Sequence, residues 1–267
     1  MIKILMVGDI VGKSGRKATQ KLVPLLRERE NLDYVIANAE NVAGGVGATP
    51  ETLTEILEAG VNVVTLGNHV WQKKEIIPYL EKEGSWALRP ANYPAGVPGT
   101  GQGVFPIVKD KGKVKVGITT LCGRIFMEPL DSPFTVGEQV VKALRAETPV
   151  VIVDFHAEAT SEKVAFGWAM DGKVSAVLGT HTHVQTADER ILPGGTAYIT
   201  DVGMTGPTDG VIGMDKETIL HRFYTSMPAR FEAASGPARL CGVILEIEET
   251  TGRAISIRRI CLDPENP

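Results

Sequence analysis

The feature that most constrains the fold is an alternation of short apolar segments with amphipathic ones through the first two thirds of the chain. Strands are predicted at Ile2–Val7, Tyr34–Ala37, Val61–Leu66, Val114–Thr119, Val150–Phe155 and Val174–Leu178. Strands that alternate with helices form βαβ units, in which helices cover both faces of a parallel sheet. The pattern therefore predicts an α/β fold with a largely parallel sheet.

The intervening segments carry helix signals. Arg16–Glu30 has an amphipathic pattern that places Leu22, Leu25 and Leu26 on one apolar face. Thr49 is a candidate N-cap with Pro50 at the first helical position, and a further helix is expected near residues 73–82. These helices supply the layer that covers the predicted strands.

The last part of the chain has a different pattern. Leu240–Glu248 and Ala254–Leu262 alternate apolar and polar residues on either side of a Gly-containing turn, which predicts a β-hairpin with one solvated face. Two insertions interrupt the fold, near 89–103 and 203–236, and the second includes the irregular stretch Gly203–Gly213. Loops of this length in a compact domain are usually functional or disordered. We interpret residues 1–267 as one domain with these insertions.

Charge and composition exclude several classes of protein. Lys and Arg number 28 against 32 Asp and Glu, a formal charge of −4, so we expect no stable nucleic-acid binding and no polybasic membrane surface. The three cysteines form no C-x-x-C pair, which favours buried free thiols in a reducing compartment. No signal-peptide pattern or membrane-length apolar run is present. We expect a cytoplasmic protein without membrane contacts.

Polar groups that bind metals follow several predicted strands. Asp9 follows the first strand, Glu40 and Asn41 the second, and Asn68 and His69 the third; His156, His181 and His183 follow later ones. The carboxyl ends of parallel strands meet at one edge of a sheet, where ligands bind. Each residue alone also fits a turn or a hydrogen-bonded half-buried position. Together they predict a metal site, because imidazole and carboxylate are common ligands of transition metals.

Other motifs carry less chemistry. Gly12-Lys13-Ser14-Gly15 resembles part of a phosphate-binding loop, but the position that requires the first glycine is Val7, so a P-loop is rejected. No G-x-S-x-G sequence supports serine hydrolysis. His221 lies in the helical pattern Glu217–Tyr224, which favours a structural or surface role.

Taken together, the blocks around these residues resemble a known family. Gly8-Asp9, Gly67-Asn68-His69 and Gly179-Thr180-His181-Thr182-His183 resemble the signatures of calcineurin-like metallophosphoesterases. Val7–Gly12, Ala39-Glu40-Asn41 and Thr200–Pro207 are similar to those of the bacterial YmdB family, over nearly the whole chain. The usual Asp-x-His block is here Asp9-Ile10-Val11, and Glu40 replaces the usual bridging aspartate. The resemblance implies a four-layer α/β/β/α sandwich around a dinuclear metal centre.

The resemblance also implies roles for individual residues. Asp9, Asn41 and His183 would hold one metal ion, Asn68, His156 and His181 the other, and Glu40 would bridge them. The cofactors would be two divalent or trivalent transition-metal ions, with iron expected first and manganese or zinc as alternatives, since the ligands are nitrogen and oxygen without thiolate. His69 would then lie beside the ions as a general acid.

The implied activity is hydrolysis of small cyclic nucleotides, preferentially 2′,3′-cyclic and also 3′,5′-cyclic phosphates, by a homo-oligomer. Two divalent ions with two carboxylates leave a net positive site that attracts a monoanionic phosphodiester. Arg89, Asn92 and Tyr93 are candidates for a phosphate contact, a polar contact and a stacking face. Two alternatives stay open: a nucleotide-sensing regulatory protein with slow turnover, and a dinuclear hydrolase of other esters or of amides.

Overall fold

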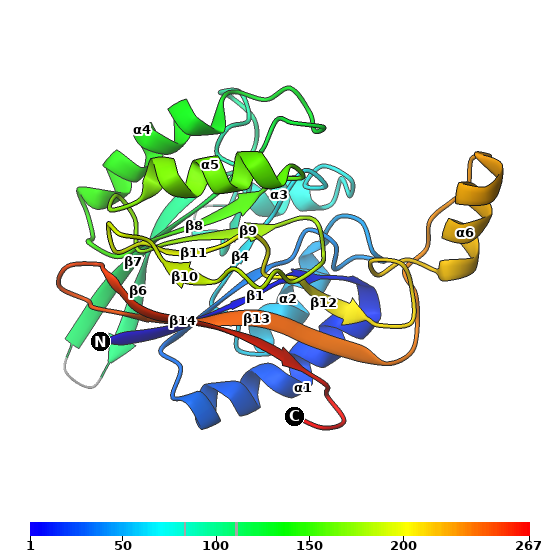
Figure 1. Cartoon of the computed structure of the whole chain (residues 1–267), viewed down its shortest axis with the longest axis horizontal. Coiled ribbons are helices and arrows are strands. Elements are labelled where there is room, and N and C mark those ends of the chain that lie inside the picture. The colour runs from blue at the N-terminus through cyan, green and yellow to red at the C-terminus, as the bar shows by residue number, and fades with distance from the viewer. Residues whose placement is uncertain (83, 110–111) are drawn as a thin grey trace.

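The computed structural model describes residues 1–82, 84–109 and 112–267. Two β-sheets pack face to face, and helices cover the outer face of each, so the chain has the four layers α/β/β/α that were predicted (Figure 1). Six helices and fourteen strands are assigned in the described part of the chain.

The first sheet contains the first three predicted strands and the C-terminal hairpin. Its order is β2-β12-β13-β1-β3-β4-β5, with β14 paired to β13. The strands β1, β3, β4 and β5 are parallel, whereas β13 is antiparallel to β1 and β14. Their bounds are Ile2–Val7 (β1), Asp9–Ile10 (β2), Tyr34–Asn38 (β3), Val63–Thr65 (β4), Ala87–Leu88 (β5), Met204–Pro207 (β12), Ala238–Ile247 (β13) and Ala254–Leu262 (β14).

The second sheet has the order β10-β11-β9-β8-β7-β6. Its inner strands are parallel, and the two edge strands β6 and β10 are antiparallel to their neighbours. The bounds are Gln102–Lys109 (β6), Gly112–Cys122 (β7), Val151–His156 (β8), Ala176–Thr180 (β9), Arg190–Ile191 (β10) and Ala197–Ile199 (β11).

The helices are divided between the two outer layers and one projection. Side chains of α1, α2 and α3 pack on the first sheet, and those of α4 and α5 on the second. The helices are α1 (Gly12–Glu30), α2 (Pro50–Glu58), α3 (Ile76–Leu80), α4 (Pro133–Arg145), α5 (Thr160–Met170) and α6 (Lys216–Thr225). Thr49 caps α2 as predicted: its side chain accepts a hydrogen bond from Thr52 N.

Two sheets in place of one largely parallel sheet follow from the alternation of side chains along a strand. On β1, Ile2, Ile4 and Met6 pack into the core between the sheets, while Leu5 and Val7 pack against the helices. Successive side chains point to opposite faces of a strand, so an apolar run can serve two different cores. The continuous apolar pattern that predicts helices on both faces is equally satisfied by a helix layer and a second sheet.

Two individual burial predictions are wrong. Leu25 is 47% exposed, whereas Leu22 and Leu26 are buried, because residues four apart share the face of α1 that meets the sheet and Leu25 is turned away from it. Cys122 and Cys241 are buried as predicted, but Cys261 is exposed on β14, and its thiol lies 3.5 Å from that of Cys241.

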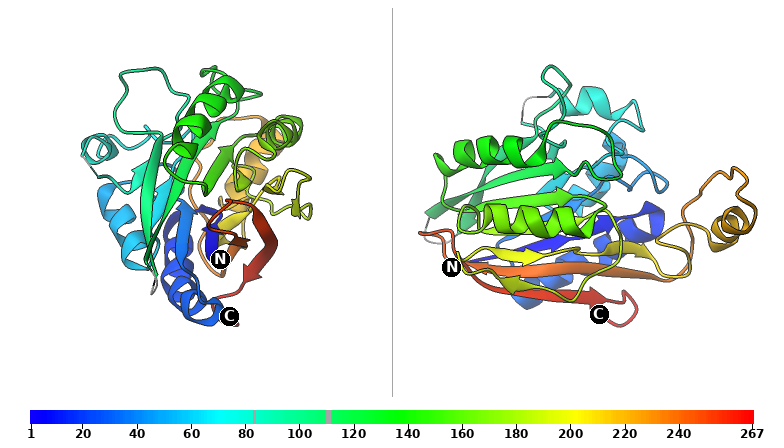
Figure 2. Two further views of the ribbon diagram at one scale, coloured as in Figure 1. Left: turned by 90° about the vertical axis from the view of Figure 1, so that its left-hand side faces the viewer. Right: turned by 45° about the horizontal axis from the view of Figure 1, so that its top comes forward.

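A projection formed by residues 209–236, here called the α6 arm, leaves the body beyond β12. Both the view of Figure 1 and the tilted view of Figure 2 show α6 standing away from the two sheets. Asp215 caps α6 by accepting a hydrogen bond from Thr218 N at 2.9 Å, and the arm closes at its base where Thr208 N donates to Pro237 O at 2.9 Å. His221 lies exposed on α6, in agreement with its predicted surface position. In the described part of the chain, no helix has both the length and the apolar character of a membrane span.

Candidate metal centre

The eight predicted site residues come together at the carboxyl ends of strands from both sheets. Those of the first sheet follow β1, β3 and β4, and those of the second sheet follow or end β8 and β9. They are Asp9, Glu40, Asn41, Asn68, His69, His156, His181 and His183, which contact one another directly or through one of the set. The structure therefore brings the predicted residues together, at the junction of two sheets and not at one edge of a single sheet.

Glu40 occupies the middle of this cluster. Its carboxylate is buried, and its Oε1 lies 3.0 Å from Asn41 Nδ2, 3.1 Å from His69 Nδ1 and 3.3 Å from His156 Nε2. Its Oε2 accepts a hydrogen bond from the backbone amide of His69 at 3.1 Å. One carboxylate therefore faces both halves of the cluster.

His156 is oriented by a chain of hydrogen bonds behind it. The Thr180 hydroxyl donates to Asp154 Oδ1 at 2.6 Å, so its oxygen accepts from His156 Nδ1 at 2.9 Å. The other ring nitrogen, Nε2, then faces Asn68 Oδ1 and His181 Nδ1, both at 3.0 Å. An outer oxygen that fixes the ring in this way is typical of metal-binding histidines.

His181 and His183 lie on a strained turn, and each ring is likewise oriented by an oxygen at its outer nitrogen. Their φ angles are 98° and 67°, which directs two side chains two residues apart toward one region. The outer nitrogen of His181, Nε2, lies 3.1 Å from Glu158 Oε2, and that of His183, Nδ1, donates to Ile212 O at 2.8 Å. Their inner nitrogens face His156 and Asn41.

The donor set fits a cation. Asp9 Oδ1 is buried and has no hydrogen-bond partner among the described residues, and such an orphan carboxylate oxygen is costly unless something pairs with it. Glu40, His156 and His181 each place one ligand atom within 4.8 Å of the other two. Carboxylate and imidazole groups that converge while His156, His181 and His183 turn one ring nitrogen outward to an oxygen form a metal-binding arrangement.

The pKa values of these groups reflect both burial and the charges of close neighbours. Burial lowers the pKa of His156, but the charges of Glu40 and Asp9 outweigh it and raise this pKa to about 9. Burial and the neighbouring His156 lower the pKa of His181 to about 3, so its ring is neutral and carries a free lone pair. Burial raises the pKa of Asp9 to about 6. A metal ion competes with the proton on His156, so metal binding at pH 7 releases protons.

Gly67 is required by the packing of the cluster. A Cβ atom at this position would lie 2.3 Å from Glu40 Oε2 and 2.4 Å from His156 Nε2. Because both contacts are shorter than real Cβ contacts, any side chain here would displace the central carboxylate or the histidine. Only glycine lets the β4 end pass this close to the site.

A buried ion pair anchors the turn that carries His181 and His183. Lys163 Nζ donates to Asp201 Oδ2 at 2.7 Å and to the backbone oxygen of Thr180 at 2.6 Å. Asp201 Oδ2 also accepts from the hydroxyl of Thr182 at 2.7 Å and from its backbone amide at 3.1 Å. Both charged side chains are about 1% exposed or less. Asp201 lies in the Thr200–Pro207 segment that resembles the family, but the sequence alone assigns it no role.

Breaking this ion pair should destabilise the protein. We expect Lys163→Met to lower the free energy of unfolding by about 3–5 kcal/mol, because it leaves the Asp201 carboxylate buried without its cation. Lys173→Met is the matched control, since Lys173 pairs with Glu138 at the surface and its loss should cost no more than about 1 kcal/mol. Urea unfolding followed by circular dichroism compares the two; equal stabilities would contradict an anchoring role for Lys163.

The candidate phosphate, polar and base contacts of the 89–103 insertion do not line the cavity that contains residues of this cluster. The Arg89 guanidinium donates to the backbone oxygens of Pro98 and Pro90. Asn92 is fully buried and bonds the backbone of Cys122 and Asp131. Tyr93 packs edge-on against Trp71 at 5.6 Å. Arg89 thus satisfies carbonyl groups of its own loop, and Asn92 joins this loop to the backbone at Cys122 and Asp131, so both side chains make structural contacts.

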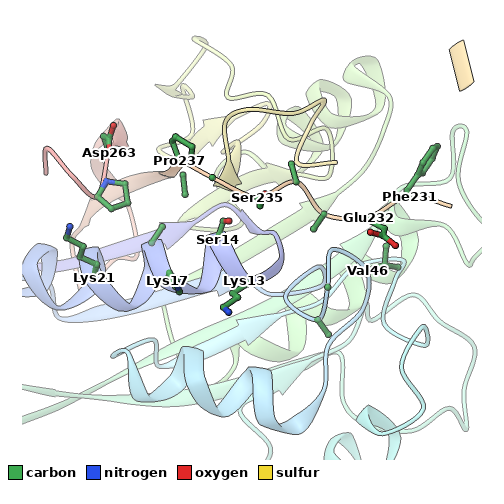
Figure 3. Close-up of a pocket in the computed structure, with 18 of the residues that line it drawn as sticks. Lys13, Ser14, Lys17, Lys21, Val46, Phe231, Glu232, Ser235, Pro237 and Asp263 are labelled. Carbon is green, nitrogen blue, oxygen red and sulfur yellow. The ribbon is translucent and has the colours of Figure 1, made fainter. Parts of the chain in front are cut away.

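The rejected phosphate-loop sequence lies in a different cavity. Lys13 and Ser14, with Lys17 and Lys21, line a hollow of about 1200 Å³ beside α1. Figure 3 shows Lys21 and Asp263 at one end of this hollow and Phe231 and Glu232 at the other. Lys21 is paired with Glu265 at 2.8 Å. None of the eight cluster residues lines this hollow, so the motif is not part of the candidate metal centre.

Comparisons with known proteins agree with this architecture. The family model described as "YmdB-like protein" matches residues 5–260. A 2′,3′-cyclic-nucleotide 2′-phosphodiesterase of Bacillus subtilis is 46% identical, over 99% of this chain and 98% of the relative.

Solved structures with a similar fold include two that are about 40% identical to this chain. A hypothetical protein from Thermus thermophilus superimposes with a TM-score of 0.90 at 41% identity, over 100% of both chains. A structure described as a novel phosphatase from Mycoplasma pneumoniae has a TM-score of 0.90 at 38% identity, over 98% of this chain and 93% of the other. A calcineurin-like phosphoesterase from Bacillus subtilis, 12% identical, shares the fold with a TM-score of 0.59 over 99% and 91% of the two chains. The chain belongs to the YmdB-like family.

Proposed function

We propose that this chain is a metal-dependent phosphodiesterase that hydrolyses small cyclic nucleotides, with 2′,3′-cyclic phosphates as the preferred substrates and 3′,5′-cyclic phosphates as secondary ones. The observation that carries the proposal is the orientation of His156, His181 and His183. Each turns one ring nitrogen outward to an oxygen. The inner nitrogens of His156 and His181 face each other beside Asn68, and that of His183 faces Asn41. The relative at 46% identity, named for 2′,3′-cyclic-nucleotide hydrolysis, supports the substrate class.

The family resemblance divides the ligands into two groups, and the contacts follow this division except at Asp9. Asp9 Oδ2 accepts from the backbone amide of His181 at 3.1 Å, and its Oδ1 lies 3.8 Å from His156 Nδ1. Asn68 Oδ1 and His181 Nδ1 each lie 3.0 Å from His156 Nε2, and these three residues would hold one ion. Asp9, Asn41 and His183 would hold the other, and Glu40 lies between the groups. Asn41 turns its amide nitrogen toward His183, so ligation through its oxygen requires the amide to turn over. Iron is the ion proposed first, with manganese and zinc as alternatives.

His69 differs from the other three histidines of the cluster. Its Nδ1, the nitrogen that meets the cluster, lies 2.8 Å from Asn41 Oδ1 and 3.1 Å from Glu40 Oε1, where it donates a hydrogen bond. Burial lowers the pKa of His69, but the hydrogen bond and charge of Glu40 outweigh it and raise this pKa. The imidazolium form of the ring is therefore favoured, and while its Nδ1–H bonds Glu40, its Nε2–H would supply the proton to an oxygen of the substrate.

When bound, two metal ions supply Lewis-acid stabilisation of the phosphoryl oxygens and activation of the attacking water. Glu40, Asn41 and the histidines would hold the ions at the wall of the cavity, so the phosphodiester would lie at that wall, where His69 would protonate the departing ribose oxygen. For a 2′,3′-cyclic phosphate this oxygen is the 2′-oxygen, so the product is the nucleoside 3′-phosphate. The strained five-membered ring makes such a substrate reactive, because part of the activation energy is already present in its ground state.

A substrate panel tests this proposal. We expect kcat/KM for 2′,3′-cyclic AMP to exceed that for 3′,5′-cyclic AMP by at least about tenfold, a difference of about 1.4 kcal/mol, with a phosphomonoester and a short RNA below both. One metal condition is used throughout. Faster cleavage of the RNA or the monoester than of both cyclic nucleotides would contradict the proposal, and so would cleavage of amides with phosphodiesters left intact.

A further inference from the structure

The cavity beside the candidate metal centre has two chemically different walls. It has a volume of about 750 Å³, inside the range of about 300–1,000 Å³ that small-molecule sites occupy. The polar wall contains Glu40, Asn41, His69, His181 and His183. The second wall comes from the α6 arm and is mainly apolar; it includes Ile212, Met214, Ile219, Phe223 and Phe231, together with Arg222.

Two phenylalanine rings dominate the arm's wall. Phe223 is 80% exposed and Phe231 is 38% exposed, although both line a cavity. The Arg222 guanidinium lies over the Phe231 ring, 4.9 Å from its centre, which braces that ring by a cation–π contact. The structure describes every residue of α6, and among them Ile219 alone is buried. Burial in a core therefore does not explain why this helix carries aromatic side chains. Exposed rings in a cavity are a surface on which a flat apolar group can stack.

The position of this wall is fixed relative to the metal ligands. Ile212, which lies on the same arm, accepts a hydrogen bond from His183 Nδ1 at 2.8 Å. Within the arm, Asp215 N donates to Glu232 O and Ala234 N donates to Gly213 O, each at 2.9 Å, so the segment with Phe231 is tied to the segment with Ile212. A ligand whose anionic group lies at the polar wall therefore meets the aromatic wall with its remaining part.

We propose that Phe223 and Phe231 form a stacking site for the base of the nucleotide whose phosphate lies at the metal centre. This inference rests on the proposed cyclic-nucleotide activity and deepens it. A nucleobase is the part of such a substrate that matches two aromatic rings, since bases stack on aromatic side chains through their π-faces. Stacking tolerates any base, so adenine, guanine, cytosine and uracil nucleotides should differ by less than about tenfold in kcat/KM.

The test compares substrates with and without a base. The double variant Phe223→Ala/Phe231→Ala should lower kcat/KM for 2′,3′-cyclic AMP by about 10- to 100-fold, mainly through KM, because each lost stacking contact weakens binding. Hydrolysis of methyl β-ribofuranoside 2,3-cyclic phosphate, which has the same ring phosphate without a base, should change by less than about twofold. Metal content should stay at the wild-type level.

Tyr224→Ala is the matched control. Tyr224 adjoins Phe223, is 86% exposed and does not line the cavity, so its loss should leave both substrates unaffected. Equal losses on both substrates in the double variant would mean that the arm only supports the metal ligands, and unchanged rates on both would mean that the rings have no substrate role; either result overturns the inference.

Binding separates failure of this inference from failure of the proposed activity. If the wild type hydrolyses no cyclic nucleotide, the proposed function is wrong, and calorimetric binding of adenosine 3′-phosphate still tests the stacking site. A loss of affinity of at least about tenfold in the double variant, but not in Tyr224→Ala, supports the site. Equal affinities in the wild type and the double variant overturn it.

Discussion

Replacing His69 with alanine should lower the rate of 2′,3′-cyclic AMP hydrolysis by about 10²–10⁴-fold while the metal content stays unchanged. His69 donates from Nδ1 to Glu40 and Asn41 and lines the cavity with its ring 30% exposed, which supports the proposed role of an acid over that of a metal ligand. A positioned acid contributes this much because the departing ribose oxygen is strongly basic. The high-pH limb of the rate profile, where the imidazolium loses its proton, should also disappear.

Two controls make the result specific. Bis(p-nitrophenyl) phosphate has a leaving group that needs little protonation, so the effect of His69→Ala should shrink strongly on this substrate. His221→Ala, at an exposed position on α6 outside the cavity, should leave all rates unchanged. Loss of metal together with activity in His69→Ala would instead assign this residue to the metal ligands.

Glu40→Gln should abolish binding of both ions and lower activity by at least about 10³-fold, since the metal centre supplies several kcal/mol of transition-state stabilisation. Glutamine keeps the shape of the side chain but removes the negative charge that faces Asn41, His69 and His156. Because Glu40 is proposed to serve both ions, its loss should lower the occupancy of both metal sites. His181→Ala or Asn68→Ala should mainly lower the occupancy of one site.

Glu158→Gln is the matched control for this carboxylate. Glu158 is half-exposed and contacts the outer nitrogen of His181, at 3.1 Å, so its neutralisation should weaken metal affinity by no more than about 10–100-fold. Metal content measured by elemental analysis after dialysis distinguishes the variants. A Glu40→Gln protein that keeps one full equivalent would show that Glu40 serves a single ion.

The positions of the strand-end residues could be predicted from the sequence, because the carboxyl ends of parallel strands lie at the edge of a sheet where ligands bind. Apolar runs such as Ile2–Val7 and Val150–Phe155 mark strands, and the residue after a parallel strand lies at a known edge of the sheet. Asp9 and His156 are therefore placed by chain position alone. The division of the strands between two sheets is not encoded in this way, because one apolar run suits a helix layer or a second sheet equally well.

The groups that orient the ligands could not be predicted. Thr180, Asp154 and the carbonyl of Ile212 act through hydrogen bonds to His156 and His183 that join distant parts of the chain. Arg89 shows the opposite case: an arginine in a glycine- and proline-rich loop suggests a phosphate contact, but here it satisfies carbonyl groups of its own loop. Local sequence does not distinguish a charge that serves the backbone from one that serves a ligand.

The aromatic wall of the α6 arm could not be recognised from the sequence for a related reason. The pattern of Glu217–Tyr224 predicts a surface helix, and α6 is one, since Phe223 and Tyr224 are both strongly exposed. Only the fold shows that Phe223 faces the cavity of the metal centre whereas Tyr224 does not.

The metal-to-protein ratio of the wild type tests the central claim most directly. Protein purified without oxygen, or reconstituted separately with iron, manganese and zinc, is analysed for bound metal and for 2′,3′-cyclic AMP hydrolysis in the same samples. The convergence of Glu40 with two groups of ligands predicts two ions per chain, with activity rising as the second ion binds. A protein that never exceeds one ion per chain with any of these metals, or that is fully active with none, would contradict the account.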